Sequence, residues 1–370
     1  MVEGSKFLGP AETYADRRHV IVLIRQAPPE AVRRIGEALA ARHGATLMAA
    51  QPIDALDETC FVLRVAEGDD AQAVSEAVEA EETVLLAYPI QRFATKQIGV
   101  ARAAIDPLST DPLVPVQAAL RVMRVDVAHG VVTGRGVRVA LVDTGVALDH
   151  PDLRDQRVDW RDFVEDGAER LAPERHGTAL ATLIAADGRN GRGMVGVAPD
   201  ASLLALRACW EAEGGGECNT FSLALALDHA IGAGVNIVNL SLGGPPDPLL
   251  AALVAKAQEA GAVVVAARGE TGFPSGLPSV VAVSDGTGGA AVPGAALRAP
   301  GVEVVSAEPR GGYDVFSGSS VAAAHASGVA ALAWSAEPSA TAEAIRAALA
   351  GERLDACVTL GAISGSSLCP

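Results

Sequence analysis

Three short segments of the sequence carry residues suited to nucleophilic hydrolysis of a carbonyl compound. They are residues 143–145 (Asp-Thr-Gly), 176–178 (His-Gly-Thr) and 317–320 (Ser-Gly-Ser-Ser). A serine hydroxyl is a weak nucleophile, so it needs a base to take its proton and a carboxylate to orient that base. Asp–His–Ser is one of the chain orders in which such a trio occurs. The sequence therefore predicts Ser320 as nucleophile, His176 as general base and Asp143 as the orienting carboxylate.

Each of these residues also has a plainer interpretation. Asp143 alone is compatible with an ordinary turn after a strand, His176 with the start of a helix, and Ser320 with a helix cap. The Asp-Thr-Gly tripeptide also marks aspartic peptidases, but those need two copies, or a homodimer, on a largely β fold. This chain has one copy in α/β surroundings. The three residues together, in this order, favour the hydrolase.

The elements that must position these residues alternate along the chain. Apolar strands and helices follow one another at residues 137–142 (strand), 203–208 (strand), 222–233 (helix), 236–240 (strand), 249–260 (helix) and 262–266 (strand). Continuous apolar strands separated by helices predict a parallel sheet covered by helices on both faces. Ligands bind at the carboxyl ends of such strands, where Asp143 and Ser241 fall. We expect this α/β domain to span residues 117–350.

A second, smaller domain precedes it. The pattern predicts the order βαββαβ within residues 19–92, which is typical of a ferredoxin-like α+β sandwich. Residues 1–18 form a polar tail. A polar, proline-containing linker is expected at 93–116, and the Ser/Gly-rich tail at 351–370 receives no function.

Composition excludes several classes of function. The formal net charge of −16 argues against nucleic-acid binding, which needs a basic surface. No run of 18 apolar residues is present, so we expect no membrane span. Residues 2–18 lack the charged-then-apolar pattern of a signal peptide.

The five cysteines do not make a disulfide scaffold. Cys209 and Cys218 flank a glycine-rich loop at 213–217, so either they close that loop as a disulfide or they are two free thiols. Cys357 and Cys369 could pair in the same way. Cys60 would then remain as a buried free thiol in an apolar strand.

Beyond the three catalytic segments, the sequence resembles the subtilisin-like serine peptidases, or subtilases, over residues 105–350. The stretches that carry the resemblance are the strand leading into Asp143, then 150–153 (His-Pro-Asp-Leu), 196–201 (Gly-Val-Ala-Pro-Asp-Ala), 239–244 (Asn-Leu-Ser-Leu-Gly-Gly), 299–301 (Ala-Pro-Gly) and 318–325 (Gly-Ser-Ser-Val-Ala-Ala-Ala-His). His325 matches a structural histidine of the family, and we assign it no catalytic role.

The resemblance implies a serine endopeptidase whose substrate is an extended peptide or protein. Main-chain hydrogen bonds to one strand would hold that substrate, and the strand residues are Ser241, Leu242, Gly243 and Gly244. It also implies that residues 19–92 are an inhibitory propeptide acting in cis on the same chain, which makes the protein a zymogen. A secreted or periplasmic location is typical of the family. A cytoplasmic one is the alternative, because no signal peptide is visible.

One departure from the family concerns the oxyanion hole. Subtilases supply an asparagine amide after a strand reading Val-Ala-Ala-x-Gly-Asn, and Glu270 occupies that position here. An ionised carboxylate only accepts hydrogen bonds, and loss of one oxyanion donor costs on the order of 10²- to 10³-fold in rate. The alternative function is therefore a catalytically impaired subtilase that binds peptides or proteins.

No cofactor is required for this chemistry, but the resemblance implies a structural calcium ion. Asp152 lies where the family places a calcium-binding aspartate, and Asn190 lies in a loop at 187–193 that resembles the partner loop. Carbonyl and carboxylate oxygens are suitable calcium ligands. A solvated polar turn is the alternative, because Arg189 and Arg192 would oppose a cation.

Overall fold

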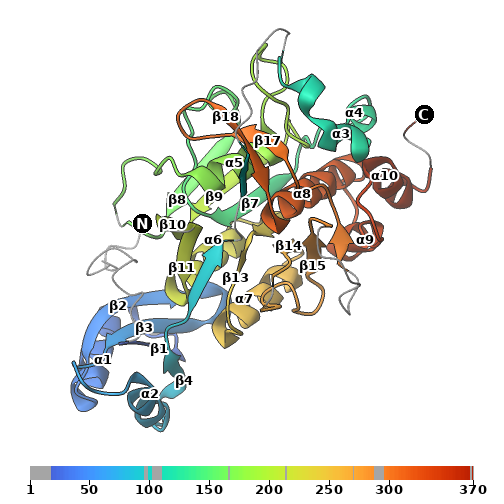
Figure 1. The fold of residues 1–370 in the computed structure, drawn as a ribbon. Helices are drawn as coiled ribbons and strands as arrows, with labels where there is room; N and C mark the ends of the chain where they lie inside the picture. Colours follow the sequence, from blue (N-terminus) through green and yellow to red (C-terminus); the bar gives the residue numbers. More distant parts are fainter. Residues whose placement is uncertain are drawn as a thin grey trace.

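The computed structural model describes residues 18–95, 99–101, 111–165, 167–212, 215–269, 271–286, 296–366 and 369. At its centre lies a seven-stranded sheet (Figure 1) in the order β16-β15-β14-β12-β7-β9-β8. Its paired strands all run parallel. Their bounds are β7 Arg138–Asp143, β8 Val158–Asp162, β9 Ser202–Arg207, β12 Ile237–Leu240, β14 Val263–Ala267, β15 Val281–Ser284 and β16 Leu297–Arg298. The predicted parallel sheet is therefore confirmed.

Helices cover both faces of this sheet because alternate residues of its buried strands point to opposite sides. Val139 and Leu141 of β7 belong to a core shared with helices α5 (Arg175–Ala185) and α8 (Ser319–Ala336). Ala140 and Val142 belong to a second core, shared with α6 (Thr220–Gly232) and α7 (Pro248–Glu259).

The N-terminal domain is a four-stranded antiparallel sheet in the order β2-β3-β1-β4, the ferredoxin-like arrangement that the sequence predicts. Its elements are β1 His19–Arg25, α1 Pro29–Arg42, β2 Thr46–Ile53, β3 Glu58–Arg64, α2 Ala71–Glu79 and β4 Val84–Pro89. One face of the sheet packs on α1 and α2. The other face, which includes Ile21 and the free, buried Cys60, joins the core of α6 and α7.

Polar contacts reinforce this interface between the two domains. The Tyr88 hydroxyl donates to Asp247 Oδ1 at 2.9 Å, and Asp247 is the N-cap residue of α7. The Ala55 N–H donates to Asp228 Oδ1 of α6 at 2.7 Å. The N-terminal domain is thus anchored on two helices of the larger domain.

The segment assigned to a linker at 93–116 differs from the prediction because it contains strands. β5 (Arg92–Thr95) lies in a sheet of order β10-β11-β5-β13, and β6 (Gly99–Ala101) pairs with β18 in a sheet of order β17-β18-β6. These short segments become strands because open strand edges of the larger domain accept their backbone groups. The partner strands are β10 Cys209–Ala212, β11 Gly215–Asn219, β13 Leu242–Gly243, β17 Val304–Ala307 and β18 Tyr313–Ser317.

The C-terminal region is also more ordered than its composition indicates. Helix α10 (Ala356–Ser364) contributes Leu360 to the core shared with α8. A disulfide joins Cys357 to Cys369, and another joins Cys209 to Cys218, so both open cysteine questions are settled in favour of disulfides. The remaining short helices are α3 Ala118–Val122, α4 Val125–Ala128 and α9 Ala342–Ala348.

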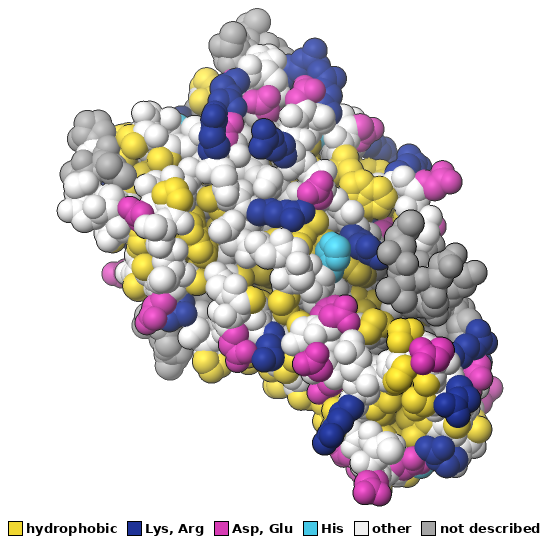
Figure 2. Space-filling model, turned by 180° about the vertical axis from the view of Figure 1, so that it is seen from behind, with side chains coloured by type: hydrophobic (Ala, Val, Ile, Leu, Met, Phe, Trp, Pro, Cys, Tyr) yellow, Lys and Arg dark blue, Asp and Glu magenta, His cyan; other side chains and the backbone are white. Residues whose placement is uncertain are grey.

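The surface carries charged side chains of both signs. On the face shown in Figure 2, acidic and basic side chains are interspersed. Within the described parts of the chain, none of the helices combines the length and the apolar character needed to cross a lipid bilayer.

Candidate active site

Asp143 and His176 meet at the carboxyl edge of the central sheet. Asp143 is the last residue of β7 and is fully buried, and His176 is the second residue of α5. His176 Nδ1 lies 2.6 Å from Asp143 Oδ1, which also accepts the N–H of Thr144. Because the carboxylate can only accept, Nδ1 carries the proton and Nε2 is left as the basic nitrogen.

Close packing between two backbone segments fixes the positions of Asp143 and His176 relative to each other. The Gly177 N–H donates to Thr144 Oγ1 at 2.9 Å. A Cβ atom at Gly177 would lie 2.3 Å from the Thr144 carbonyl oxygen, so only glycine lets helix α5 approach the Asp143 turn this closely.

Ser320 is the second residue of α8. Gly318 precedes the helix with φ 148°, a conformation that side chains rarely adopt. Ser320 Oγ donates to the Ser241 carbonyl at 3.2 Å. Ser241 Oγ in turn donates to Asn239 Oδ1 at 2.9 Å, which ties the nucleophile's helix to the end of β12.

His176 and Ser320, the predicted base and nucleophile, are not hydrogen-bonded to each other in this structure. His176 Nε2 is buried without a hydrogen-bond partner among the described residues.

A segment of the same chain lies on the strand predicted to bind substrate. β5 pairs antiparallel with β13, with Thr95 opposite Leu242 and Ala94 opposite Gly243. On its other edge β5 pairs antiparallel with β11, with Phe93 opposite Cys218. An extended backbone held between two strands is the mode by which a peptide adds to a sheet.

Phe93 anchors this segment. Its side chain is 3% exposed, and its ring lies 6.0 Å from the ring of Phe273. A Cβ atom at Gly244 would come within 2.2 Å of Phe93. Gly244 therefore opens the space that the phenyl ring fills.

Glu270 lies outside the described residues. The strand before it, β14, ends at Ala267, and the next residue, Arg268, accepts a 2.8 Å hydrogen bond from Ser319 Oγ through its carbonyl. The chain therefore passes directly beside the start of α8 two residues before Glu270.

The structure adds a buried ion pair that sequence reasoning missed. Glu174 Oε1 and Oε2 accept from Arg207 Nη2 and Nε at 2.8 and 2.9 Å, and Arg207 Nη1 donates to Asp162 Oδ2 at 3.1 Å. The two carboxylates raise the pKa of Arg207 above its usual range. Arg207 ends an otherwise apolar strand, and a buried cation there is the signal that a carboxylate partner must exist.

Asp152 and Asn190, the predicted calcium ligands, lie close to one another. Asp152 is fully buried, and its Oδ2 accepts from the Met194 N–H and the Tyr313 hydroxyl. Its Oδ1 has no hydrogen-bond partner among the described residues. Asn190 Nδ2 donates to the carbonyl of Pro151, the residue before Asp152.

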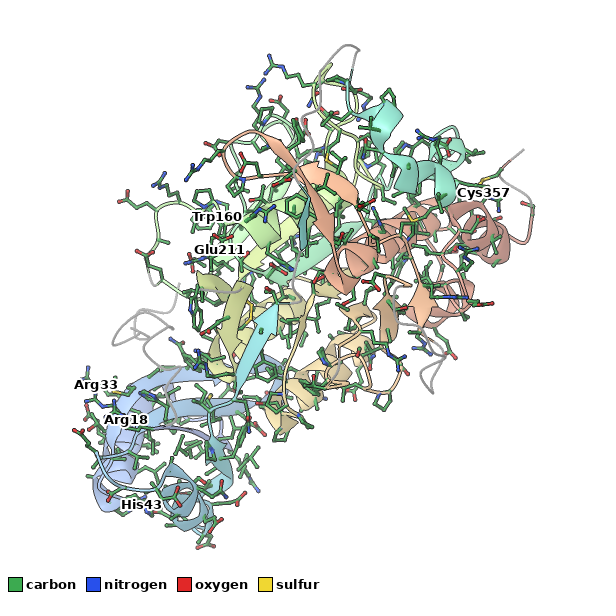
Figure 3. The ribbon with its side chains drawn as sticks, viewed as in Figure 1. Arg18, Arg33, His43, Trp160, Glu211 and Cys357 are labelled. Carbon is green, nitrogen blue, oxygen red and sulfur yellow. A yellow bond between two sulfur atoms is a disulfide. The ribbon has the colours of Figure 1, made fainter. Side chains whose placement is uncertain are left out.

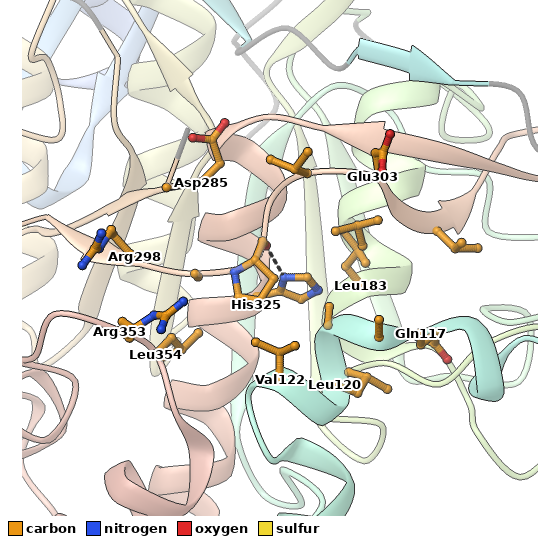
Figure 4. A pocket seen from close by; sticks show the side chains of 18 of the residues that line it. Gln117, Leu120, Val122, Leu183, Asp285, Arg298, Glu303, His325, Arg353 and Leu354 are labelled. Atoms are coloured by element: carbon orange, nitrogen blue, oxygen red, sulfur yellow. Dashed lines mark hydrogen bonds between the residues drawn. The ribbon is translucent and has the colours of Figure 1, made fainter. Parts of the chain in front are cut away.

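His325 lies away from this chemistry. Its Nδ1 donates to the Pro300 carbonyl at 2.7 Å, and burial lowers its pKa to about 4. The ring borders a cavity of about 560 Å³ (Figure 4), which Leu120, Arg298 and Arg353 also line. The structure therefore agrees with the structural role assigned to it.

Comparisons with known proteins agree on one family. The model of the subtilase family matches residues 134–353. M-protease of Shouchella clausii is 32% identical over 307 residues, covering 75% of this chain and 78% of its own. Thermitase of Thermoactinomyces vulgaris is 34% identical over 221 residues, covering 55% of this chain and 77% of its own.

One solved structure shares the fold across nearly the whole chain. Fervidolysin from Fervidobacterium pennivorans, described as a keratinolytic enzyme related to subtilisin, superposes with a TM-score of 0.75 at 20% identity. The match covers 97% of this chain and 62% of fervidolysin.

Proposed function

Because the chain belongs to the subtilase family and is a subtilisin-like serine endopeptidase, we propose that it cleaves peptide bonds with Ser320, His176 and Asp143 and is made as a zymogen. The 2.6 Å contact between Asp143 and His176, at the sheet edge where α8 begins, supports this triad. β5 pairs with both β11 and β13, which supports the proposal that residues 19–95 inhibit the active site of the same chain.

The proposed reaction follows from the geometry. His176 Nε2 takes the proton of Ser320 Oγ, and the oxygen attacks the carbonyl carbon of the scissile bond. Nε2 then gives that proton to the leaving amine, and water removes the acyl group by the same steps in reverse. Asp143 stays ionised and stabilises the imidazolium. The Ser320 N–H, at the N-terminus of α8, is placed to favour the developing oxyanion.

The first substrate in this proposal is the chain itself. β5 ends at Thr95 and pairs with the substrate strand. β6 begins at Gly99, which pairs with Ser317 three residues before the nucleophile. The chain is thus paired with the larger domain on both sides of positions 96–98, so we place the first cleavage between Thr95 and Gly99.

Active-site labelling tests the catalytic assignment. A serine-directed phosphonate should label the parent protein, and Ser320→Ala should lose both the label and hydrolysis of a casein-type substrate. Equal labelling of the two proteins would refute the role of Ser320. The relatives named as proteases favour this enzyme over the binding-protein alternative raised by Glu270.

A calcium ion at Asp152 is a further part of the proposal. The unpartnered, buried Asp152 Oδ1 suits a cation, and a Cβ atom at Gly193 would lie 2.3 Å from both Asp152 oxygens, so this glycine leaves space beside them. Asp152, Asn190 and loop carbonyls would hold the ion, which would stabilise the loop. Calcium should raise the melting temperature of the parent but not that of Asp152→Asn, and equal shifts would contradict the site.

We also propose an extracytoplasmic location. Disulfides persist in oxidising compartments, and the structure contains two of them. Recovery of all five cysteines as free thiols from the native source would favour the cytoplasmic alternative.

A further inference from the structure

Glu174, two residues before His176, is the centre of a buried hydrogen-bond network. Its side chain is about nine-tenths buried. Besides the two bonds from Arg207, its carboxylate accepts the Gly145 N–H at 2.5 Å and the Glu211 N–H at 3.2 Å. Four donors from three separate segments therefore converge on one carboxylate.

The first of these links joins the two loops that carry Asp143 and His176. Gly145 lies two residues after Asp143, and Glu174 is the N-cap residue of the helix that carries His176. A Cβ atom at Gly145 would come within 1.9 Å of the Ala172 carbonyl oxygen. The contact is thus a close one between two backbones, with the Glu174 carboxylate bonded across it.

The main chain of Glu174 makes a second link between the same two loops. Its carbonyl accepts from Thr178 Oγ1 at 2.6 Å, and the same hydroxyl oxygen accepts the Ala147 N–H at 2.9 Å. Side chain and main chain of one residue therefore fix the turn after Asp143 against helix α5 at two points.

The other links reach β9 and the sheet that holds β5. Glu211, on β10 (Figure 3), gives its N–H to Glu174 and accepts the Arg175 N–H through Oε1 at 2.5 Å. β10 pairs with β11, the strand that holds β5, and the Cys209–Cys218 disulfide joins them. Arg207 ends β9, the neighbour of β7 in the central sheet.

We propose that Glu174 is a positioning residue of this peptidase: it sets the geometry of the Asp143–His176 hydrogen bond, with Arg207 holding its carboxylate in place. The proposal rests on the triad assigned above. Glu174 touches no reacting atom. A loosened turn would lengthen the bond between Asp143 and His176, which would weaken the stabilisation of the imidazolium in the transition state.

Kinetics of Glu174→Gln test this role. An amide at this position cannot accept all four donors, because its nitrogen faces a donor. We expect kcat per active site, counted with a serine-directed phosphonate, to fall at least 10-fold while KM changes less than 2-fold. The acidic limb of the kcat/KM profile should move to lower pH, because His176 loses carboxylate stabilisation of its charged form.

Two variants control for damage to the fold. Asp355→Asn disrupts the bidentate pair between Asp355, the N-cap residue of α10, and Arg124, the N-cap residue of α4. It should leave kcat and the pH limb unchanged. Glu174→Gln/Arg207→Met also removes the buried cation, which the single change leaves with one carboxylate partner, Asp162, instead of two. It should recover thermal stability without recovering kcat. A Glu174 variant that loses only stability, with kcat per site and the pH limb unchanged, would overturn the proposal.

A spectroscopic measurement separates this proposal from the triad assignment. In the Ser320→Ala background, the Nδ1 proton of His176 should give a low-field NMR resonance because of the short bond to Asp143. Adding Glu174→Gln should shift or broaden that resonance, and adding Asp355→Asn should not. An unmoved resonance would overturn the role of Glu174 while leaving the triad standing. Absence of the resonance before Glu174 is changed would instead count against the Asp143–His176 assignment.

Discussion

Thr95 lies opposite Leu242 in an antiparallel pair, so the end of the N-terminal domain occupies the strand that the sequence assigns to substrate. Four residues later the chain pairs again, with Gly99 opposite Ser317. A peptide substrate and this segment cannot occupy the same edge together. In the zymogen proposed above, release of the segment is therefore the step on which activity depends.

Phe93→Ala should weaken that inhibition. The ring is the buried anchor of β5, and truncating such an anchor typically costs about 2 kcal/mol or more of binding free energy, which is about 30-fold in the dissociation constant. Hydrolysis of a peptide substrate should therefore appear earlier after cleavage. Leu85→Ala, at a position 46% exposed in the same domain, is the matched control. Identical time courses for both variants and the parent would show that Phe93 does not anchor the inhibitor.

Glu270→Asn should raise kcat by up to about two orders of magnitude, because it restores an amide donor of the kind whose loss costs that much. Glu270→Gln should help less, since its longer side chain misplaces the amide. The measurement is turnover of one peptide substrate by the three proteins across pH. If Glu270→Asn is no faster than the parent at any pH, this carboxylate does not weaken the oxyanion hole.

His325 should make stability depend on pH. Its pKa in the folded protein is about 4, below the ordinary value of 6.5, because burial disfavours the charged ring. Between pH 6.5 and pH 4 the unfolded chain binds more protons than the folded protein. The contribution of neutral His325 to the free energy of unfolding is therefore fully present above pH 6.5 and is lost as the pH falls towards 4. The loss is about 3 kcal/mol.

Unfolding free energies measured in the Ser320→Ala background, which prevents self-digestion, check this expectation. The protein should lose about 3 kcal/mol more between pH 7 and pH 4 than the same protein carrying His325→Gln. Parallel curves would mean that His325 titrates normally in the folded state.

The parts of the structure that sequence could predict are those with a local signal. The strand that ends in Asp143 is an apolar run. Gly177 beside His176 marks a close approach seen in the structure, and Gly318 before Ser320 marks a backbone conformation that side chains rarely adopt. The order βαββαβ of the N-terminal domain could also be predicted, because each of its elements shows a short periodic pattern of apolar residues. For each of these features, the residues that make up the sequence signal lie within a few positions of one another.

The features that sequence missed depend on distant partners. β5 and β6 are only four and three residues long, and they become strands only because the edges at β13 and β18 are open to them. Glu174 and Arg207 are 33 positions apart, and neither stands in a motif. Arg207 at the end of an apolar strand indicated a buried partner but not which carboxylate supplies it.

The mass of the purified protein tests the central claim most directly. If the chain is a zymogen with Ser320 as nucleophile, the parent should separate into two fragments cut between Thr95 and Gly99, while Ser320→Ala stays intact under the same conditions. A parent that remains whole at every pH and calcium concentration tried, or a Ser320→Ala protein cut at the same place, would contradict the account.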